Sequence, residues 1–256
     1  NTAETVSAIL NASGTGSALY TSVAMAPAGG AAWTISGAIA GVLVDLNGAD
    51  SVTIDGLNSG GNALTFDNTS ATATAATIRF IADASSNTVQ NCTIKGAETG
   101  AASGTIVIST GTATGNVSDV ISANTITSSG ANLPTNAIYS AGTSTVIANT
   151  ASITNNNIQD YYSATVASNG IQVASNSTAW TITGNRFFQG ATRTATVANT
   201  HRAINIITAS GSGYTISSNT IGFANSGGTG TPPYARAFAI RFFAIELTAA
   251  TSPVSN

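Results

Sequence analysis

Charged side chains are scarce in this chain of 256 residues. Asp, Glu, Lys and Arg make up 7% of it, against about 25% in an average soluble domain. The formal net charge is −3 and Lys95 is the single lysine. The chain therefore lacks the basic surface that neutralises phosphates in nucleic-acid binding. Its solubility must come from Ser, Thr, Asn and Gly, and no nucleic-acid partner is expected.

Cysteine and long apolar runs are also nearly absent. Cys92 is the only cysteine, which excludes an internal disulfide and a thiolate metal cluster. We expect Cys92 to be a small core residue, because free cysteine is among the most buried residue types. The longest strongly apolar stretch, Ala38–Leu46, is interrupted by Asp45 and is too short to cross a bilayer. The chain is therefore not expected to span a membrane.

One short pattern occurs six times: an aliphatic residue, a short polar residue three positions later, and an aliphatic or aromatic residue five positions later. Its starts are separated by 37, 32, 32, 29 and 34 residues. A period in this range is typical of a solenoid, in which each repeat buries apolar side chains only against its neighbours. The instances are Val52/Asp55/Leu57, Val89/Cys92/Ile94, Ile121/Asn124/Ile126, Ile153/Asn156/Ile158, Ile182/Asn185/Phe187 and Ile216/Asn219/Ile221.

A second series of alternating segments runs in phase with the first. It opens at Ile78, Ile106, Ile138, Ile171, Ile204 and Phe238. Two series with one period predict at least two strands per turn, and the Val, Ile, Thr and Phe content favours strands. Only Glu4–Leu10 is plausible as a short helix.

These features predict an all-β fold, a right-handed parallel β-helix of six to seven coils with about 33 residues per coil. A turn of this length supplies the crossover that parallel strands need, and such crossovers are usually right-handed. The alternative is an antiparallel sandwich, which gives no reason for a repeating sequence. We expect one internal stack formed by Val52, Val89, Ile121, Ile153, Ile182 and Ile216.

The polar position of the pattern has a mechanical explanation. Two aliphatic residues five apart cannot both point inward in a straight strand, so the chain must bend between them. Asn tolerates the left-handed backbone region and bonds nearby backbone groups. We expect Asn124, Asn156, Asn185 and Asn219 to stack as an amide ladder with a structural role.

The ends of the chain differ from its middle. Trp33–Gly37 (WTISG) echoes Trp180–Gly184 (WTITG), which predicts an irregular first coil or N-terminal cap over residues 1–41 and β-helix repeats over 42–256. Val254–Asn256 falls where a seventh copy should begin. We therefore expect the repeats to be truncated at the C-terminal end and the chain to be part of a longer one.

The segments Val89–Ile94 (VQNCTI) and Ser218–Phe223 (SNTIGF) resemble the right-handed parallel β-helix repeats of very long secreted surface proteins. The likeness is to those of Bacteroidetes-type bacteria in particular, which the type IX secretion system exports. It spans about Val42–Asn256. The resemblance implies a secreted or cell-surface location and a role as adhesin, stalk or filament, whereas some relatives with this fold cleave polysaccharides. The C-terminal sorting domain of that family is not visible here.

Few residues are candidates for chemistry. Asp45, Asp50 and Asp55 are close in sequence and are the best candidates for a carboxylate pair or a Ca²⁺ site, although structural or solvated roles are the alternative. No other cofactor is expected.

The only histidine, His201, precedes Arg202. The column Asn136, Asn169, Arg202 and Arg236 recurs at steps of 33, 33 and 34 residues. His201, Arg202 and Arg236 are therefore the best candidates for a ligand-binding spot, although solvated arginines that cover apolar surface are the favoured interpretation.

These observations lead to a hypothesis of a non-enzymatic segment of an extracellular surface protein. Its expected partner is a cell-surface, secretion or anchoring protein, or a surface polysaccharide. The alternative is a polysaccharide lyase or hydrolase, whose groove would hold two carboxylates beside an arginine or lysine. A third interpretation, ice or crystal-face binding, needs a Thr-x-Thr column. The pairs Thr72/Thr74 and Thr125/Thr127 do not recur in phase, which ranks it last.

Overall fold

The computed structural model of the chain describes residues 1–208, 211–231, 234–235 and 238–248. Short strands run through these ranges, and none of the described residues is helical. The helix expected over Glu4–Leu10 is wrong, because β1 (Thr2–Glu4) and β2 (Ala8–Asn11) occupy that stretch. The fold is therefore all-β.

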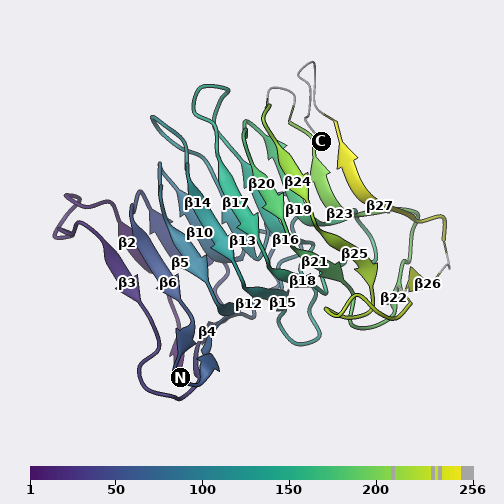
Figure 1. Ribbon diagram of the computed structural model, residues 1–256, viewed down its shortest axis with the longest axis horizontal. Helices are drawn as coiled ribbons and strands as arrows, with labels where there is room; N and C mark the ends of the chain where they lie inside the picture. The colour runs from purple at the N-terminus through teal and green to yellow at the C-terminus, as the bar shows by residue number, and fades with distance from the viewer. Residues whose placement is uncertain (209–210, 232–233, 236–237, 249–256) are drawn as a thin grey trace.

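Each turn of the chain adds one strand to each of three sheets, which we call A, B and C (Figure 1). Sheet A holds β1, β4 (Trp33–Gly37), β9 (Leu64–Asn68), β12 (Cys92–Gly96), β15 (Thr125–Ser128), β18 (Asn157–Gln159), β21 (Arg186–Phe188) and β25 (Thr220–Phe223). Sheet B holds β2, β5 (Val42–Asn47), β10 (Ala76–Ile81), β13 (Ile106–Ile108), β16 (Asn136–Ala141), β19 (Ser168–Ser175), β23 (Thr200–Ile206) and β27 (Arg241–Leu247).

Sheet C holds β3 (Val23–Met25), β6 (Val52–Asp55), β11 (Thr88–Gln90), β14 (Asp119–Ser122), β17 (Ala151–Thr154), β20 (Thr181–Thr183) and β24 (Thr215–Ser217). Two small pairs lie outside these sheets. One is the hairpin β7 (Leu57–Asn58) and β8 (Gly61–Asn62), and the other is the parallel pair β22 (Arg193–Thr194) and β26 (Tyr234–Ala235).

Every neighbouring pair within sheets A, B and C is parallel, and the partners lie one turn apart. The predicted parallel β-solenoid is therefore confirmed, and the sandwich alternative is wrong. The core is one cluster of aliphatic and aromatic side chains inside the three sheets. It runs along the whole axis because each turn covers the apolar side chains of the next.

The internal stack of sheet C follows the predicted register from Val89 onward, through Ile121, Ile153, Ile182 and Ile216. Its first predicted member is wrong. Ile54 is the partner of Val89, whereas Val52 pairs with Val23. Both Val52 and Ile54 are 2% exposed, because residues two apart share one face of a strand. Alternation alone therefore could not choose between them.

The second series corresponds to sheet B and is wrong only at its last member. Ile78, Ile106, Ile138, Ile171 and Ile204 pair in succession. Ile204 is followed in register by Ile245, not by Phe238, which precedes β27. The cause is the long connection after β25, which delays the last strand of sheet B. Residues 1–41 hold β1 to β4, and β1, β2 and β3 each pair in parallel one turn later.

The corner between sheets C and A is made by one left-handed residue. It lies directly before the ladder residue of each turn. The expectation that the ladder Asn itself adopts the left-handed conformation is therefore wrong. In successive turns it is Asn91 (φ 55°), Ala123 (φ 54°), Asn155 (φ 57°), Gly184 (φ 70°) and Ser218 (φ 54°). Alanine is the least suitable of these, because its Cβ crowds the backbone in the left-handed region.

Replacing Ala123 by glycine is expected to raise the free energy of unfolding by about 0.5–1 kcal/mol, since relief of left-handed strain outweighs the entropy that glycine loses. Urea unfolding measures the change. Ala137→Gly is the control, because Ala137 is a buried strand residue without a positive φ and should lose stability. A loss in both variants would contradict the strain argument.

Candidate functional site

The three carboxylates proposed as a metal or catalytic group have separate partners. Asp45 is 5% exposed and forms a bidentate pair with Arg79, with Nη2–Oδ2 at 2.7 Å and Nε–Oδ1 at 3.0 Å. Asp50 accepts a hydrogen bond from the backbone N–H of Ser85 at 2.8 Å. Each therefore serves to join neighbouring turns.

Asp55 is engaged in the same way. It accepts hydrogen bonds from the side chains of Gln90 and Asn91, both at 2.8 Å, and from the Leu57 N–H. Burial alone would raise the pKa of Asp55. Together these hydrogen bonds lower the pKa by a larger amount, so it lies below its ordinary value. Among the described residues no three His, Cys, Asp or Glu side chains converge as a cation site. The proposed Asp45/Asp50/Asp55 group is therefore not assembled.

The proposed ligand-binding spot is also built differently from the expectation. His201 is 1% exposed, and Arg202 is paired with Glu246 of β27. Asn169 and Arg202 are neighbours in register as expected, but the next residue in the column is Phe243. Arg236 lies outside the described residues, as does Val254–Asn256. The structure therefore gives Arg202 a carboxylate partner and places His201 in the interior.

The column before Arg202 forms hydrogen bonds along the axis. Asn169 Nδ2 donates to Asn136 Oδ1 at 2.7 Å, and Asn205 Nδ2 donates to Asn169 Oδ1 at 3.1 Å. Asn136 in turn donates to backbone carbonyls, among them that of Ser103 at 2.7 Å. Asn136 therefore attaches the connection between β12 and β13 to sheet B, and Asn169 and Asn205 join neighbouring strands of that sheet.

Asn124, Asn156, Asn185 and Asn219 form a continuous amide ladder at the corner between sheets C and A. The Oδ1 atoms of Asn156, Asn185 and Asn219 each accept two hydrogen bonds from the rung before, one from the backbone N–H and one from Nδ2, at 2.9–3.1 Å. Each Nδ2 also donates to a carbonyl of the sheet C stack one turn earlier. The amides of this corner are therefore used in bonds to one another and to the backbone, which is a structural role.

Cys92 occupies the first position of this ladder. Its backbone N–H donates to Asn124 Oδ1 at 2.9 Å, and its thiol donates to the Gln90 carbonyl at 3.1 Å. Burial, with a smaller contribution from Asp55, raises the pKa of the Cys92 thiol to about 12. The thiol therefore stays protonated and packs as part of the core. Asp55, which the sequence pattern placed at the ladder position, is instead in register with Gln90.

A second ladder, which the sequence pattern did not reveal, lies at the corner between sheets B and C. Asn87 Oδ1 accepts from the Val52 N–H, and Asn87 donates from both its backbone N–H and Nδ2 to Asp119 Oδ1. Asp119 is fully buried, and its Oδ2 has no partner among the described residues. Burial outweighs the bonds from Asn87 and raises the pKa of Asp119 to about 8.

The outer face of sheet C carries two axial columns of mostly hydroxyl side chains. They flank the internal stack, and a pair of hydroxyl residues two apart recurs in three successive turns, at Ser152/Thr154, Thr181/Thr183 and Thr215/Ser217. One column is Thr53, Thr88, Val120, Ser152, Thr181 and Thr215; the other is Asp55, Gln90, Ser122, Thr154, Thr183 and Ser217. Signals in the sequence were Ser152–Thr154 (SIT), Thr181–Thr183 (TIT) and Thr215–Ser217 (TIS).

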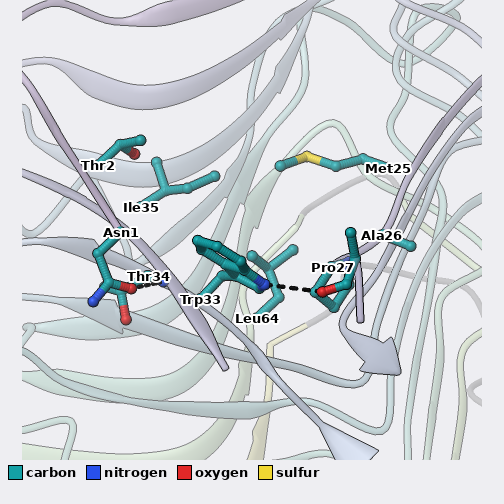
Figure 2. Close-up of a pocket in the computed structure, with 10 residues that line it drawn as sticks. Asn1, Thr2, Met25, Ala26, Pro27, Trp33, Thr34, Ile35 and Leu64 are labelled. Atoms are coloured by element: carbon teal, nitrogen blue, oxygen red, sulfur yellow. Dashed lines mark hydrogen bonds between the residues drawn. The ribbon is translucent and has the colours of Figure 1, made fainter. Parts of the chain in front are cut away.

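A shallow apolar cavity of about 300 Å³ lies at the first turn. Figure 2 shows Trp33 in its centre, with the indole Nε1 donating to the Ala28 carbonyl at 3.2 Å and Asn1 Oδ1 accepting from the Thr34 N–H at 2.9 Å. Trp33 is 43% exposed in sheet A, whereas Trp180 precedes a sheet C strand and is fully buried. The similar segments Trp33–Gly37 and Trp180–Gly184 therefore lie in different sheets of the turn.

A third polar cluster, centred on Asp83, clamps the long connection before β14. The carboxylate of Asp83 accepts hydrogen bonds from the Thr112 hydroxyl and from the backbone N–H groups of Thr112, Ala113, Thr114 and Gly115. Burial raises the pKa of Asp83, but these hydrogen bonds outweigh it and hold that pKa far below its ordinary value. Asp83 therefore stabilises the loop as a carboxylate.

Asp83→Asn is expected to lower the free energy of unfolding by about 1–2 kcal/mol at pH 7, because charge-assisted bonds are lost but the site is partly solvated. The folded pKa is lowered, so this contribution is present above the ordinary value of 3.8 and is lost as pH falls below it. Urea unfolding from pH 7 to pH 3 should show the difference shrinking. A difference that does not depend on pH would contradict a role for the charge.

In the described part of the chain, no helix is long and apolar enough to cross a membrane. In comparisons with known proteins, no family model, no curated protein and no solved structure matches this chain.

Proposed function

We propose that this chain is a non-enzymatic, rigid segment of an extracellular surface protein, which acts as a stalk, filament or adhesin and is exported by a type IX-like route. The observation that carries the proposal is the unbroken axial stacking. Three parallel sheets, one core and the Asn124–Asn219 ladder run through successive turns without a break. Such a solenoid is stiff along its axis because each turn is fixed to both neighbours.

The charged side chains support a mechanical role over a catalytic one. The ion pairs Asp45–Arg79, Asp160–Arg193 and Arg202–Glu246 each join two different turns. A glycoside hydrolase instead needs two carboxyl groups within about 5–9.5 Å of each other, flanking the scissile bond. The polysaccharide lyase or hydrolase remains the alternative function that an activity assay distinguishes.

Two experiments test the proposal. In the source bacterium, protease treatment of intact cells should degrade the protein, and loss of the secretion machinery should keep it inside. The purified chain should not turn over acidic or neutral polysaccharides. Turnover that is abolished by Asp45→Asn or Asp55→Asn would establish the enzyme instead, and protection from protease on intact cells would contradict a surface location.

Binding to an ordered solid such as ice is a second candidate, favoured by the hydroxyl columns of sheet C. Inhibition of ice recrystallisation tests it. Thr154→Lys and Thr183→Lys place bulky charges on that face and should abolish the effect, whereas Thr65→Lys and Thr93→Lys on sheet A should not. No effect of the wild-type protein on ice growth would remove this candidate.

A further inference from the structure

One imidazole joins two connections between sheets A and B to the outer side of sheet B. The ring of His201, in β23, stacks on Tyr162 with centroids 4.7 Å apart and an interplanar angle of 27°. On another side it lies 5.8 Å from the ring of Tyr234 in β26. Tyr234 also contacts Phe242 of β27, with centroids 5.6 Å apart. His201 therefore fills the space between two connections that come from different turns.

The hydrogen bonding of this ring suits only a neutral imidazole. Ser168 Oγ lies 2.6 Å from His201 Nδ1, and His201 Nε2 has no partner among the described residues. An imidazolium has two N–H donors and needs two acceptors. Protonation would leave one buried N–H without an acceptor, in a site that is 1% exposed.

The neighbouring charge of Arg202 also opposes protonation of the ring. Arg202 is the next residue and is paired with Glu246 of β27, and Arg193 of β22 is paired with Asp160 beside the same connections. The other titratable groups that face the ring are the two tyrosines. Burial, and secondarily Arg202, lowers the pKa of His201 to about 4, and burial raises the pKa of Tyr162 and Tyr234. The tyrosines therefore stay neutral throughout the acid range.

We propose that His201 is an acid-sensitive latch, whose protonation releases the connections carrying Tyr162 and Tyr234 while the three-sheet solenoid stays folded. The connections also contact each other through Tyr162–Tyr234 and through the β22–β26 pair, but His201 is the titratable ring that both tyrosines contact. The turns of the solenoid are held by the amide ladder between sheets C and A and by a continuous apolar core. Acid therefore acts on the first set of contacts and not on the second.

The direction of the effect follows from linkage. The folded pKa of His201 is lowered from its ordinary 6.5 to about 4, so the stabilisation by the neutral ring is present above pH 6.5 and is lost as pH falls toward 4. Across this window the equilibrium constant for opening rises about tenfold per pH unit.

Hydrogen exchange of the full chain tests the proposal. Between pH 6.5 and pH 4.5, peptides that contain Tyr162 or Tyr234 should lose at least tenfold in protection after correction for intrinsic rates, while peptides from β14 and β17 keep theirs. His201→Phe fills the space without a titratable group and should abolish the loss. An equal loss in His201→Phe, or simultaneous loss in β14 and β17, would overturn the latch.

A second measurement does not depend on the variant folding. His201 is the only histidine, so its imidazole resonance in an NMR titration is unambiguous. A midpoint well below 6.5 that moves upward in Arg202→Gln supports the latch. A midpoint near 6.5 would overturn it, and neither outcome bears on whether the protein is a surface stalk.

Discussion

Replacing Asn156 by alanine is expected to lower the free energy of unfolding by about 3–5 kcal/mol, since each buried polar group left without a partner costs about 1–3 kcal/mol. Asn156 Oδ1 accepts the backbone N–H and the Nδ2 of Asn124, and Asn156 Nδ2 donates to the Ile121 carbonyl. Alanine removes the partner of the Asn124 backbone N–H and of the Ile121 carbonyl inside a fully buried corner, and it leaves Asn124 Nδ2 with only its bond to the Val89 carbonyl. Urea unfolding monitored by far-ultraviolet circular dichroism measures the loss.

The matched control is Asn132→Ala. Asn132 is exposed, and only its backbone takes part in a recorded hydrogen bond, so the change should stay within about 0.5 kcal/mol. If Asn156→Ala were as mild as Asn132→Ala, the ladder would not be a source of stability and the support for a rigid rod would weaken.

Asp119→Asn is expected to stabilise the protein at pH 8 by about 2–4 kcal/mol and to have little effect at pH 4. The pKa of Asp119 is raised from 3.8 to about 8. The contribution of Asp119 to stability is therefore fully present below pH 3.8 and is lost as pH rises toward 8, because the carboxyl ionises in the unfolded chain while burial keeps it protonated in the folded protein. An amide does not ionise, and Asn87 in the preceding turn already bonds through Nδ2 to the Ala49 carbonyl.

Unfolding curves at pH 4, 6 and 8 measure this difference. Asp55→Asn is the control, because the pKa of Asp55 is lowered and its charge is hydrogen-bonded; the variant should lose stability at pH 8. A wild-type stability that does not change between pH 4 and pH 8 would contradict a buried, protonated Asp119.

The period of the sequence was sufficient to predict the solenoid, because stacked turns place equivalent residues against each other. Ile121, Ile153, Ile182 and Ile216 are one stack in the sequence and in the structure. The prediction went wrong where turns differ in length. The β7–β8 hairpin after Asp55 lengthens its turn, and Ile54 rather than Val52 is in register with Val89. The long connection before β27 puts Ile245 rather than Phe238 in register with Ile204.

The site was harder to predict, because contacts between connections of unequal length leave no period. Asp45 pairs with Arg79, which lies 34 residues later in the sequence, and this separation matches one turn. Arg202 pairs with Glu246, which lies 44 residues later, and this separation does not. The stacking of Tyr162 and Tyr234 on His201 has no counterpart in the other turns that the structure describes. The hydroxyl columns, by contrast, could have been predicted from the sequence, because their residues directly precede and follow the members of the internal stack.

The Asn ladder has a direction, since Asn156 and Asn185 each accept two hydrogen bonds from the rung before and donate two to the rung after. A head-to-tail contact of this kind has no symmetry that closes it. The number of turns is therefore set by how many repeats a gene encodes and not by the geometry of the corner. Duplication or deletion of one whole repeat, such as residues 124–155, leaves each internal rung with a donor on one side and an acceptor on the other. This architecture can therefore change length in evolution without a new design of its core.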